Sequence, residues 1–234
     1  RDAVRCALSP RAVAILGASD DTTKWGGSIM NLVRKFKYPG AVYPVNPRAE
    51  TVQGLKAYPS VSAIGQPVDV AVVVVPQALT LAAFEDCAKA GVKVALMVTS
   101  QFAESGAEGA ALQDQLLQIA QRAGMRIIGP NCMGYFSSQH DLCLLNAQAL
   151  MRNDQLIKGN IALISQSGAL AGAMLSRAYD LGTGFSFCVS LGNQADLEVC
   201  DFLEYAIGDA NSEVIALYVE GNKDGARFLH LLRA

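Results

Sequence analysis

The stretch VAILGASDDTTKWGGSIMNLV, residues 13–33, decides how this chain folds. An apolar run, a glycine turn, a polar loop and an amphipathic segment follow one another there, which predicts a strand and then a helix. The alternation continues, with helices expected near 25–37, 78–90 and 108–123 and strands in AVYPV (41–45), DVAVVVVP (69–76), VKVALMVT (92–99) and MRIIGP (125–130). Apolar strands separated by helices form parallel sheets covered on both faces. We therefore expect a doubly wound, Rossmann-like α/β domain over residues 1–137.

A second α/β unit is expected over residues 160–234, after a connector (138–159) without a clear strand period. Its strands are predicted in IALIS (161–165), GFSFCVS (184–190) and VIALYVE (214–220), with helices over 169–181, 195–207 and 223–233. Three strands are fewer than the usual sheet of about five to six. The chain starts at Arg1 without Met and stops within the last expected helix. We expect both ends to be cuts and this second unit to be incomplete.

Composition places the chain among compact globular proteins, because 51% of residues are hydrophobic and 17% are charged. A net charge of -2 gives no indication of a nucleic-acid partner. The six cysteines form no CxxC pair, so reduced and mostly buried thiols are expected. The longest apolar run falls far short of the roughly 18 residues that a membrane span needs, and no basic-then-apolar leader opens the chain. We expect a cytoplasmic protein with no membrane partner.

The loop after the first strand has the character of an anion site. It consists of Gly17, Ala18, Ser19 and Asp20, placed where a helix begins and backbone N–H groups are unpaired. The loop departs from the GxGxxG dinucleotide pattern, because Ser19 stands at the second glycine position and Gly26 and Gly27 come late. A plain strand-to-helix turn is the alternative.

The second strand ends in Asn46, Pro47 and Arg48. An NAD site would place an acidic residue there to bond the ribose hydroxyls. Neutral and basic groups favour a ribose that carries a phosphate, as in NADP or coenzyme A (CoA). A solvated surface cation is the alternative for Arg48.

The next three strands end in loops that also face the ligand edge of a parallel sheet. They contribute Val75 and Pro76, then Thr99, Ser100 and Gln101, then Asn131 and Cys132. Pro76 begins its turn, and the second of these loops is predicted to be a mobile cover. A nucleophilic cysteine needs a nearby histidine. None lies in the neighbouring loops, so a structural role is predicted for Cys132.

In the second unit the first strand ends in Ser165, Gln166, Ser167 and Gly168 and opens a helix of small residues. Two hydroxyls at a helix N-terminus can cradle a phosphate or an oxyanion, although Ser167 as an N-cap explains part of the pattern. Gly192 and Asn193 follow the next strand. Glu220 is the only carboxylate that ends a strand in this unit, which favours a role in handling a proton or orienting a cationic side chain.

Together these loops resemble the nucleoside-diphosphate-forming (ADP-forming) acyl-CoA synthetases and the α subunit of succinyl-CoA synthetase. The resemblance spans nearly the whole chain, through RAVAILGAS, YPVNP, VVVP, IGPNCMG, ISQSGALA, SLGNQAD and ALYVEG. It implies that the first domain binds CoA and that the second is flavodoxin-like and serves phosphohistidine chemistry.

The resemblance also implies roles for the loop residues. Gly17, Ala18, Ser19 and Asp20 would face the CoA phosphates, with Asn46, Pro47 and Arg48 at the adenosine end. The nucleotide and pantetheine path would be lined by Val75, Pro76, Thr99, Ser100 and Gln101, and Asn131 joins the CoA-binding set. Ser165, Gln166, Ser167 and Gly168 would hold phosphate or a phosphorylated histidine, whose imidazole Glu220 would bond. Gly192 and Asn193 lie near the acyl and thiol end, where acyl specificity is expected to depend on residues 192–196.

The implied reaction converts a small carboxylic acid, CoA and ATP to acyl-CoA, ADP and phosphate, through an acyl phosphate and a phosphorylated histidine. Neither His140, in the connector, nor His230, in the final helix, occupies the family position of that histidine. The chain alone is thus expected to bind CoA without turnover. ATP and Mg²⁺ would come with an ATP-grasp domain or subunit, so no metal site is expected here. The complete protein is expected to be oligomeric.

Two other functions remain open at this point. A CoA-sensing module of a larger protein, such as a protein acetyltransferase, would use the same fold without the histidine; Glu220 favours the ligase, because a sensor has no imidazole to orient. An NADP-binding oxidoreductase is disfavoured because no paired catalytic His, Tyr or Lys constellation is present.

Overall fold

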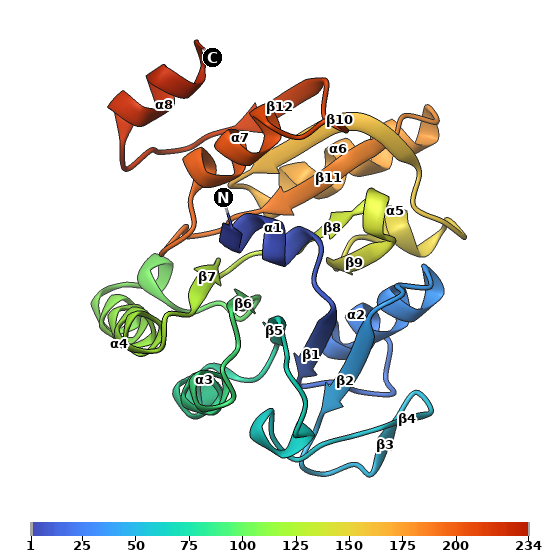
Figure 1. Cartoon of the computed structure of the whole chain (residues 1–234), viewed down its shortest axis with the longest axis vertical. Coiled ribbons are helices and arrows are strands. Elements are labelled where there is room, and N and C mark those ends of the chain that lie inside the picture. Colours follow the sequence, from blue (N-terminus) through green and yellow to red (C-terminus); the bar gives the residue numbers. More distant parts are fainter. Residues whose placement is uncertain (1, 234) are drawn as a thin grey trace.

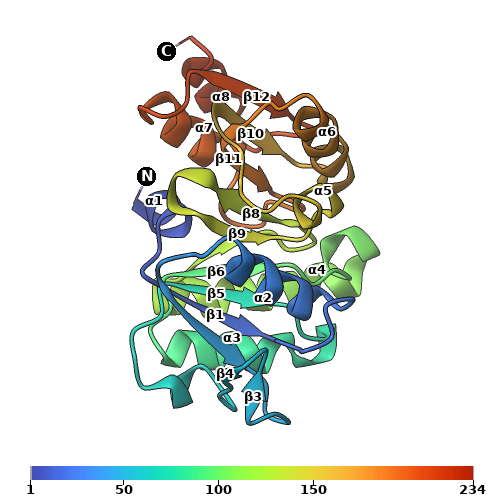
Figure 2. The ribbon, with the colours of Figure 1, turned by 90° about the vertical axis from the view of Figure 1, so that its right-hand side faces the viewer.

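The computed structural model describes residues 2–233 and consists of two α/β units, one stacked on the other (Figures 1 and 2). The first sheet is fully parallel, with strand order β2-β1-β5-β6-β7. Its strands are β1 (Ala12–Leu16), β2 (Ala41–Val45), β5 (Val70–Val73), β6 (Val94–Met97) and β7 (Arg126–Ile128). The Rossmann-like prediction for this part of the chain is confirmed.

Side chains alternate between the two faces of this sheet. Ala14 and Leu16 pack on one face, beneath helices α3 (Thr80–Lys89) and α4 (Ala107–Ala123). Val13 and Ile15 point to the other face, where they meet α1 (Asp2–Leu8), α2 (Trp25–Lys35) and residues of the second unit. The strands β1, β5 and β6 are buried on both sides, which is why their sequences are continuous apolar runs.

The second sheet has five strands in the order β12-β10-β11-β8-β9. The three strands predicted for residues 160–234 are present, and two more come from residues 134–145, which the sequence analysis places in the first domain and the connector. Its parallel part comprises β10 (Lys158–Ser165), β11 (Phe185–Ser190) and β12 (Val214–Tyr218), flanked by α6 (Gly168–Asp180), α7 (Val199–Ile207) and α8 (Gly225–Leu231). The antiparallel part is formed by β8 (Gly134–Ser137) and β9 (Leu142–Leu145), with short helices η4 (Ser138–His140) and α5 (Gln148–Met151). Both hairpin strands are buried throughout, so they show no alternation of polar and apolar residues.

One apolar core joins the two units. Val13 and Ile15 of the first sheet belong to the same buried cluster as Ile164 and Phe187 of the second. Tyr135 lies fully buried in this cluster, and its hydroxyl donates a hydrogen bond to the carbonyl of Ala7 at 2.8 Å. Burial holds the pKa of Tyr135 well above its usual range. The two units therefore pack as one block.

A polar contact closes the same interface at the sheet edge. Arg126 donates two hydrogen bonds to the carboxylate of Asp196, each at 2.8 Å, and the backbone N–H of Ile127 donates a third. The hydrogen bonds that Arg126 donates to Asp196 raise the pKa of Arg126. Asp196, expected near the site of acyl specificity, instead joins the two units.

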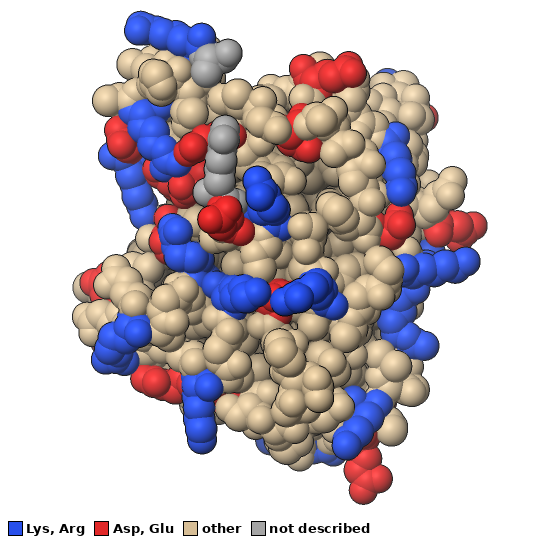
Figure 3. Space-filling model, in the orientation of Figure 1, with Lys and Arg blue, Asp and Glu red and all other residues tan. Residues whose placement is uncertain are grey.

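The cysteines are free, the surface of the face shown in Figure 3 carries charges of both signs, and the described helices are too short or too polar to cross a membrane. The six cysteines are free, and burial raises the pKa of Cys87, Cys132 and Cys143 to about 12. Figure 3 shows acidic side chains lying among the basic ones on one face of the molecule. Within residues 2–233 no helix has both the length and the apolar character that crossing a membrane requires.

We predict that Asp196→Ala lowers the free energy of unfolding by about 2 kcal/mol, because three hydrogen bonds to a charged acceptor are lost at an interface that stays partly solvated. Urea denaturation measures the loss. Asp114→Ala, at an exposed position of α4, is the matched control. Equal stabilities of the two variants would show that the Arg126 contact does not hold the units together.

Candidate functional site

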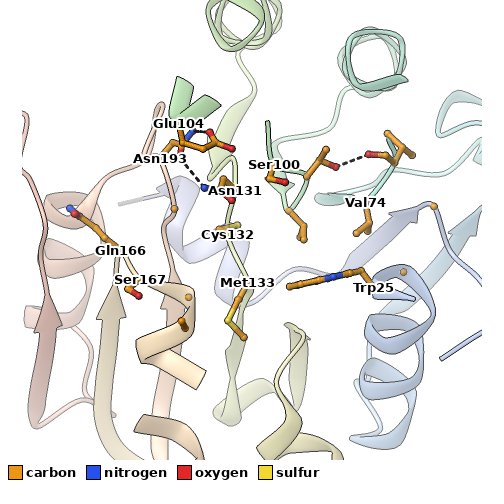
Figure 4. A pocket seen from close by; sticks show the side chains of 18 of the residues that line it. Trp25, Val74, Ser100, Glu104, Asn131, Cys132, Met133, Gln166, Ser167 and Asn193 are labelled. Atoms are coloured by element: carbon orange, nitrogen blue, oxygen red, sulfur yellow. Dashed lines mark hydrogen bonds between the residues drawn. The ribbon is translucent and has the colours of Figure 1, made fainter. Parts of the chain in front are cut away.

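The carboxyl ends of strands from both sheets meet around one cleft, with a volume of about 860 Å³ (Figure 4). Many of the residues predicted from the sequence line it, namely Gly17, Val75, Pro76, Thr99, Ser100, Asn131, Gln166, Ser167, Gly168, Gly192, Asn193 and Glu220. The cleft is the ligand position expected for a parallel α/β sheet, here shared by two of them.

The loop between β1 and α2 forms one wall. Gly17 has a φ of +86°, and a Cβ there would lie 2.6 Å from the carbonyl oxygen of Val74. Ala18, Ser19 and Asp20 do not line the cleft. The Ser19 hydroxyl accepts a bond from the N–H of Asp21, and the Asp20 carboxylate accepts one from Gln53. The polar groups of Ser19 and Asp20 thus serve the shape of the loop.

The first turn of α2 reaches the cleft through Lys24, Trp25 and Gly26. Lys24 occupies the N-cap position but makes no side-chain capping bond. An uncapped helix start presents unpaired N–H groups and the positive end of the helix dipole to an anion. The sequence analysis missed Lys24 and Trp25; their place directly after the polar loop was the available signal.

The end of β2 lies apart from the cleft lining. The side-chain amide of Asn46 donates to the carbonyl of Ala18 at 2.9 Å, and its oxygen accepts from the N–H of Arg48 at 2.9 Å. Pro47 and the side chain of Arg48 are exposed. Asn46 therefore shapes the β1–α2 loop, and the role of Arg48 at an adenosine phosphate stays a prediction.

The loops after β5 and β6 are tied to each other. Thr99 donates to the carbonyl of Val75 at 2.7 Å, and Gln77 donates to that of Gln101 at 2.6 Å. Gln101 lies outside the lining, with its backbone N–H bonded to Glu104. These bonds connect the β6–α4 loop to the β5–α3 loop; the mobility predicted for the β6–α4 loop stays a prediction.

Glu104 and Asn193 bridge the two units across the cleft (Figure 4). The Asn193 amide donates to the Glu104 carboxylate at 2.5 Å and to Gln113 at 3.1 Å, and Asn131 donates to Asn193 at 3.4 Å. Partial burial acts to raise the pKa of Glu104, but the hydrogen bonds from Asn193 and from backbone N–H groups hold it below its usual value. Sequence reasoning missed Glu104 because its partner is 89 residues away.

Cys132 lines the cleft as a buried group. Its thiol contacts the carbonyl of Met97 at 3.3 Å, and burial raises its pKa to about 12. A thiol with that pKa stays protonated near neutral pH and is a poor nucleophile. The geometry agrees with the structural role predicted for Cys132.

The second wall is the β10–α6 turn. Ser165 is buried and donates to the carbonyl of Ser167 at 2.7 Å. Ser167 caps α6 by accepting from the N–H of Leu170 at 3.2 Å. A Cβ at Gly168 would lie 2.6 Å from Cγ of Met133, so the small residue lets the helix start approach the first unit closely.

Gln166 connects this turn to Glu220. Its carbonyl oxygen accepts from the N–H groups of Glu220 and Gly221 at 2.6 and 3.0 Å, and its amide donates to the carbonyl of Gly221 at 2.5 Å. The polar atoms of Gln166 therefore hold the Glu220 loop, and not the space where a phosphate was expected. Glu220 itself is exposed and faces the cleft.

Lys223 connects the same loop to the loop after β11 by donating to the carbonyls of Gln194 and Ala195. Neither histidine of the chain is among the residues that line the cleft. Within residues 2–233 no three His, Cys, Asp or Glu side chains gather in a way that could hold a metal ion.

Two α/β units that share a cleft at their strand ends, each with a helix N-terminus facing it, define a class of anion-binding proteins. Residues 11–137 match the family model described as "CoA binding domain", and residues 158–234 match "Succinyl-CoA ligase like flavodoxin domain". The chain belongs to the family of ADP-forming acyl-CoA synthetases, and its first unit is the family's CoA-binding domain.

Two similar proteins are ADP-forming acetate–CoA ligases. The α subunit of acetate–CoA ligase [ADP-forming] II from Pyrococcus furiosus is 41% identical over 97% of this chain and 48% of its own length. Acetate–CoA ligase [ADP-forming] I from Archaeoglobus fulgidus is 40% identical over 96% of this chain and 32% of its own. The chain thus spans half or less of these relatives.

A solved structure gives the same fold. The dinucleotide-forming acetyl-coenzyme A synthetase 1 of Ca. Korarchaeum cryptofilum, in complex with phosphate and ADP, superimposes with a TM-score of 0.91 at 38% identity. The match covers 97% of this chain and 48% of that one. The predicted family and fold class are confirmed.

We predict that Gln166→Met lowers the free energy of unfolding by about 2 kcal/mol, because three backbone groups of the Glu220 loop lose their partner. Amide hydrogen exchange at Glu220 and Gly221 should accelerate. Gln121→Met, on the exposed face of α4, is the control for the change of side chain. Unchanged exchange at both amides would contradict the assignment.

Proposed function

We propose that this chain is the CoA-binding part of an ADP-forming acyl-CoA synthetase, which joins a small carboxylic acid to CoA with ATP and releases ADP and phosphate. The observation that carries the proposal is the shared cleft, which has the uncapped start of α2 on one side and the start of α6 on the other. Such a cleft suits one anionic group at the start of α2 and a second, such as a phosphoryl group, at the start of α6.

The residues present fit CoA. Its phosphates suit the first turn of α2, where Lys24 adds a cation whose side chain is 70% exposed. Trp25 and Met133 both line the cleft, and Figure 4 shows the ring of Trp25 extending toward Met133. These apolar groups suit the uncharged pantetheine arm. CoA would supply the thiol that becomes acylated.

In this proposal the α6 start receives a phosphoryl group, with Ser167 and Gly168 closest to it. Glu220 would accept a bond from the imidazole of a phosphorylated histidine and fix its tautomer. Gln166 holds the backbone of the Glu220 loop, so the loop would already be in place when the carboxylate meets that imidazole. Asn46, Pro47 and Arg48 would lie toward the adenosine end, and Gly192 and Asn193 toward the acyl group.

The partner would be an ATP-grasp domain or subunit that brings ATP and Mg²⁺. Relatives named as α subunits support a partner subunit. The complete assembly would be oligomeric and would act in the cytoplasm. Acetate is the first acid to test, because the similar proteins carry that name.

Calorimetric titration of the chain with CoA, dephospho-CoA, NADP and NAD tests the proposal. A helix N-terminus contributes about 0.3 to 1 kcal/mol per anion, whereas micromolar affinity needs about 8, so CoA must contact several loops. We expect micromolar CoA binding, weaker binding of dephospho-CoA and no response to NAD. Tight NADP binding without a response to CoA would overturn the proposal.

Trp25→Ala should raise the Kd for CoA on the order of tenfold, because apolar area that the pantetheine arm covers is lost from the cleft wall. Adenosine 3′,5′-bisphosphate lacks that arm, so its Kd should stay the same. Calorimetry measures how much Trp25→Ala raises the Kd for each ligand, and the ratio of the two changes shows whether Trp25 contacts the pantetheine arm. Equal losses for both ligands would place Trp25 at the adenosine end.

A further inference from the structure

The β3–β4 hairpin, formed by β3 (Thr51–Val52) and β4 (Leu55–Lys56), carries an unusual turn. Its two central residues, Gln53 and Gly54, have φ values of +47° and +78°. Two-residue hairpin turns of this kind are normally filled by Asn, Asp or Gly, because other side chains are strained at positive φ. A strained residue that persists in a fold is often held by a function.

Gln53 reaches from this turn into the β1–α2 loop. Its side-chain amide donates to the carbonyl of Ser19 at 3.0 Å and to that of Gly27 at 2.9 Å. Its backbone N–H donates to the Asp20 carboxylate at 2.5 Å, and its carbonyl accepts from Arg34 on α2. The hairpin tip is therefore bonded to the loop and to the helix that follows it.

The direction of these bonds matters for the loop. In a trans peptide unit the C=O and the following N–H point in opposite directions. The carbonyl of Ala18 is held by Asn46 and that of Ser19 by Gln53. The N–H groups of Ser19 and Asp20 are consequently turned away from these two amides. Two side-chain amides from outside the loop thus fix the orientation of consecutive peptide units.

We propose that Gln53 is a positioning residue for CoA, acting through the Ser19 and Gly27 carbonyls to hold the β1–α2 loop and the first turn of α2 in the binding conformation. The inference rests on the proposed function. Gln53 does not line the cleft, so its effect on affinity runs through the loop. A loop already held in its bound shape loses less conformational freedom on binding.

Gln53→Asn separates this role from the stability of the hairpin. Asn is favoured at positive φ, so the turn keeps its shape, but the side chain is one methylene shorter and cannot reach both carbonyls. We expect the Kd for CoA to rise about tenfold, the scale set by two lost neutral hydrogen bonds, while Tm is unchanged or higher.

A rise in Kd without a fall in Tm is the readout that a merely structural role would not give, and hydrogen exchange shows where the loop has changed. In the free variant the amides of Ser19 and Asp20 should exchange faster than in the parent chain, and saturating CoA should remove the difference. Gln66→Asn, at an exposed position outside the cleft, is the matched control and should change neither affinity nor loop exchange.

An unchanged Kd for Gln53→Asn in a chain that binds CoA would overturn the inference and leave the proposed function intact. Absence of CoA binding by the parent chain would instead overturn the proposed function. If the amides of Ser19 and Asp20 exchange at the same rate in the free variant and in the free parent chain, Gln53 does not hold the β1–α2 loop. That result would refute the inference without any measurement of binding.

Discussion

The packing of the two units around one buried apolar cluster is the constraint on which the rest of the structure depends. Val13 and Ile15 on one side and Ile164 and Phe187 on the other lie in one buried cluster, with Tyr135 bonded to α1 inside it. Because protein interiors are close-packed, this core leaves little freedom for the units to slide. The strand ends of both sheets therefore converge, and a cleft forms where they meet.

The cleft contains both positive groups that suit an anionic ligand and carboxylates of the protein. The starts of α2 and α6 present positive dipole ends, and Lys24 adds a positive charge whose ammonium lies 3.8 Å from the Asp21 carboxylate. Glu104 and Glu220 oppose an anionic ligand, but the charge of Glu104 is engaged by Asn193. Glu220 remains exposed, its loop held by Gln166. A carboxylate kept free in such a place is suited to a cationic or N–H-bearing partner.

The sequence predicts the elements whose pattern is local. Strands such as residues 12–16 and 70–73 are continuous apolar runs followed by glycine or proline, and α6 follows a serine cap, so their existence and order could be derived. The β8–β9 hairpin was missed because its strands are short and wholly buried. The β3–β4 hairpin was missed because Gln53-Gly54 is not the usual Asn-Gly signal.

In the site, too, the residues with a local sequence signal could be predicted and the long-range contacts could not. Residues at strand ends, such as Ser167 and Gly192, could be found because parallel topology fixes where strand ends lie. The partners of Gln166, Glu104 and Asp196 could not, since they are 55, 89 and 70 residues away. The contact of Gln166 depends on the pairing of β10 with β12, and those of Glu104 and Asp196 depend on how the two units dock. Sequence thus located the cleft, whereas the bonds that shape it required coordinates.

The crystal structure of this chain with CoA tests the central claim most directly. The account predicts the pyrophosphate at the first turn of α2, the pantetheine arm between Trp25 and Met133, and the thiol directed toward Ser167 and Gly168. CoA bound outside the cleft, or lying in it with the thiol directed away from α6, would contradict the claim that the two helix starts form one site.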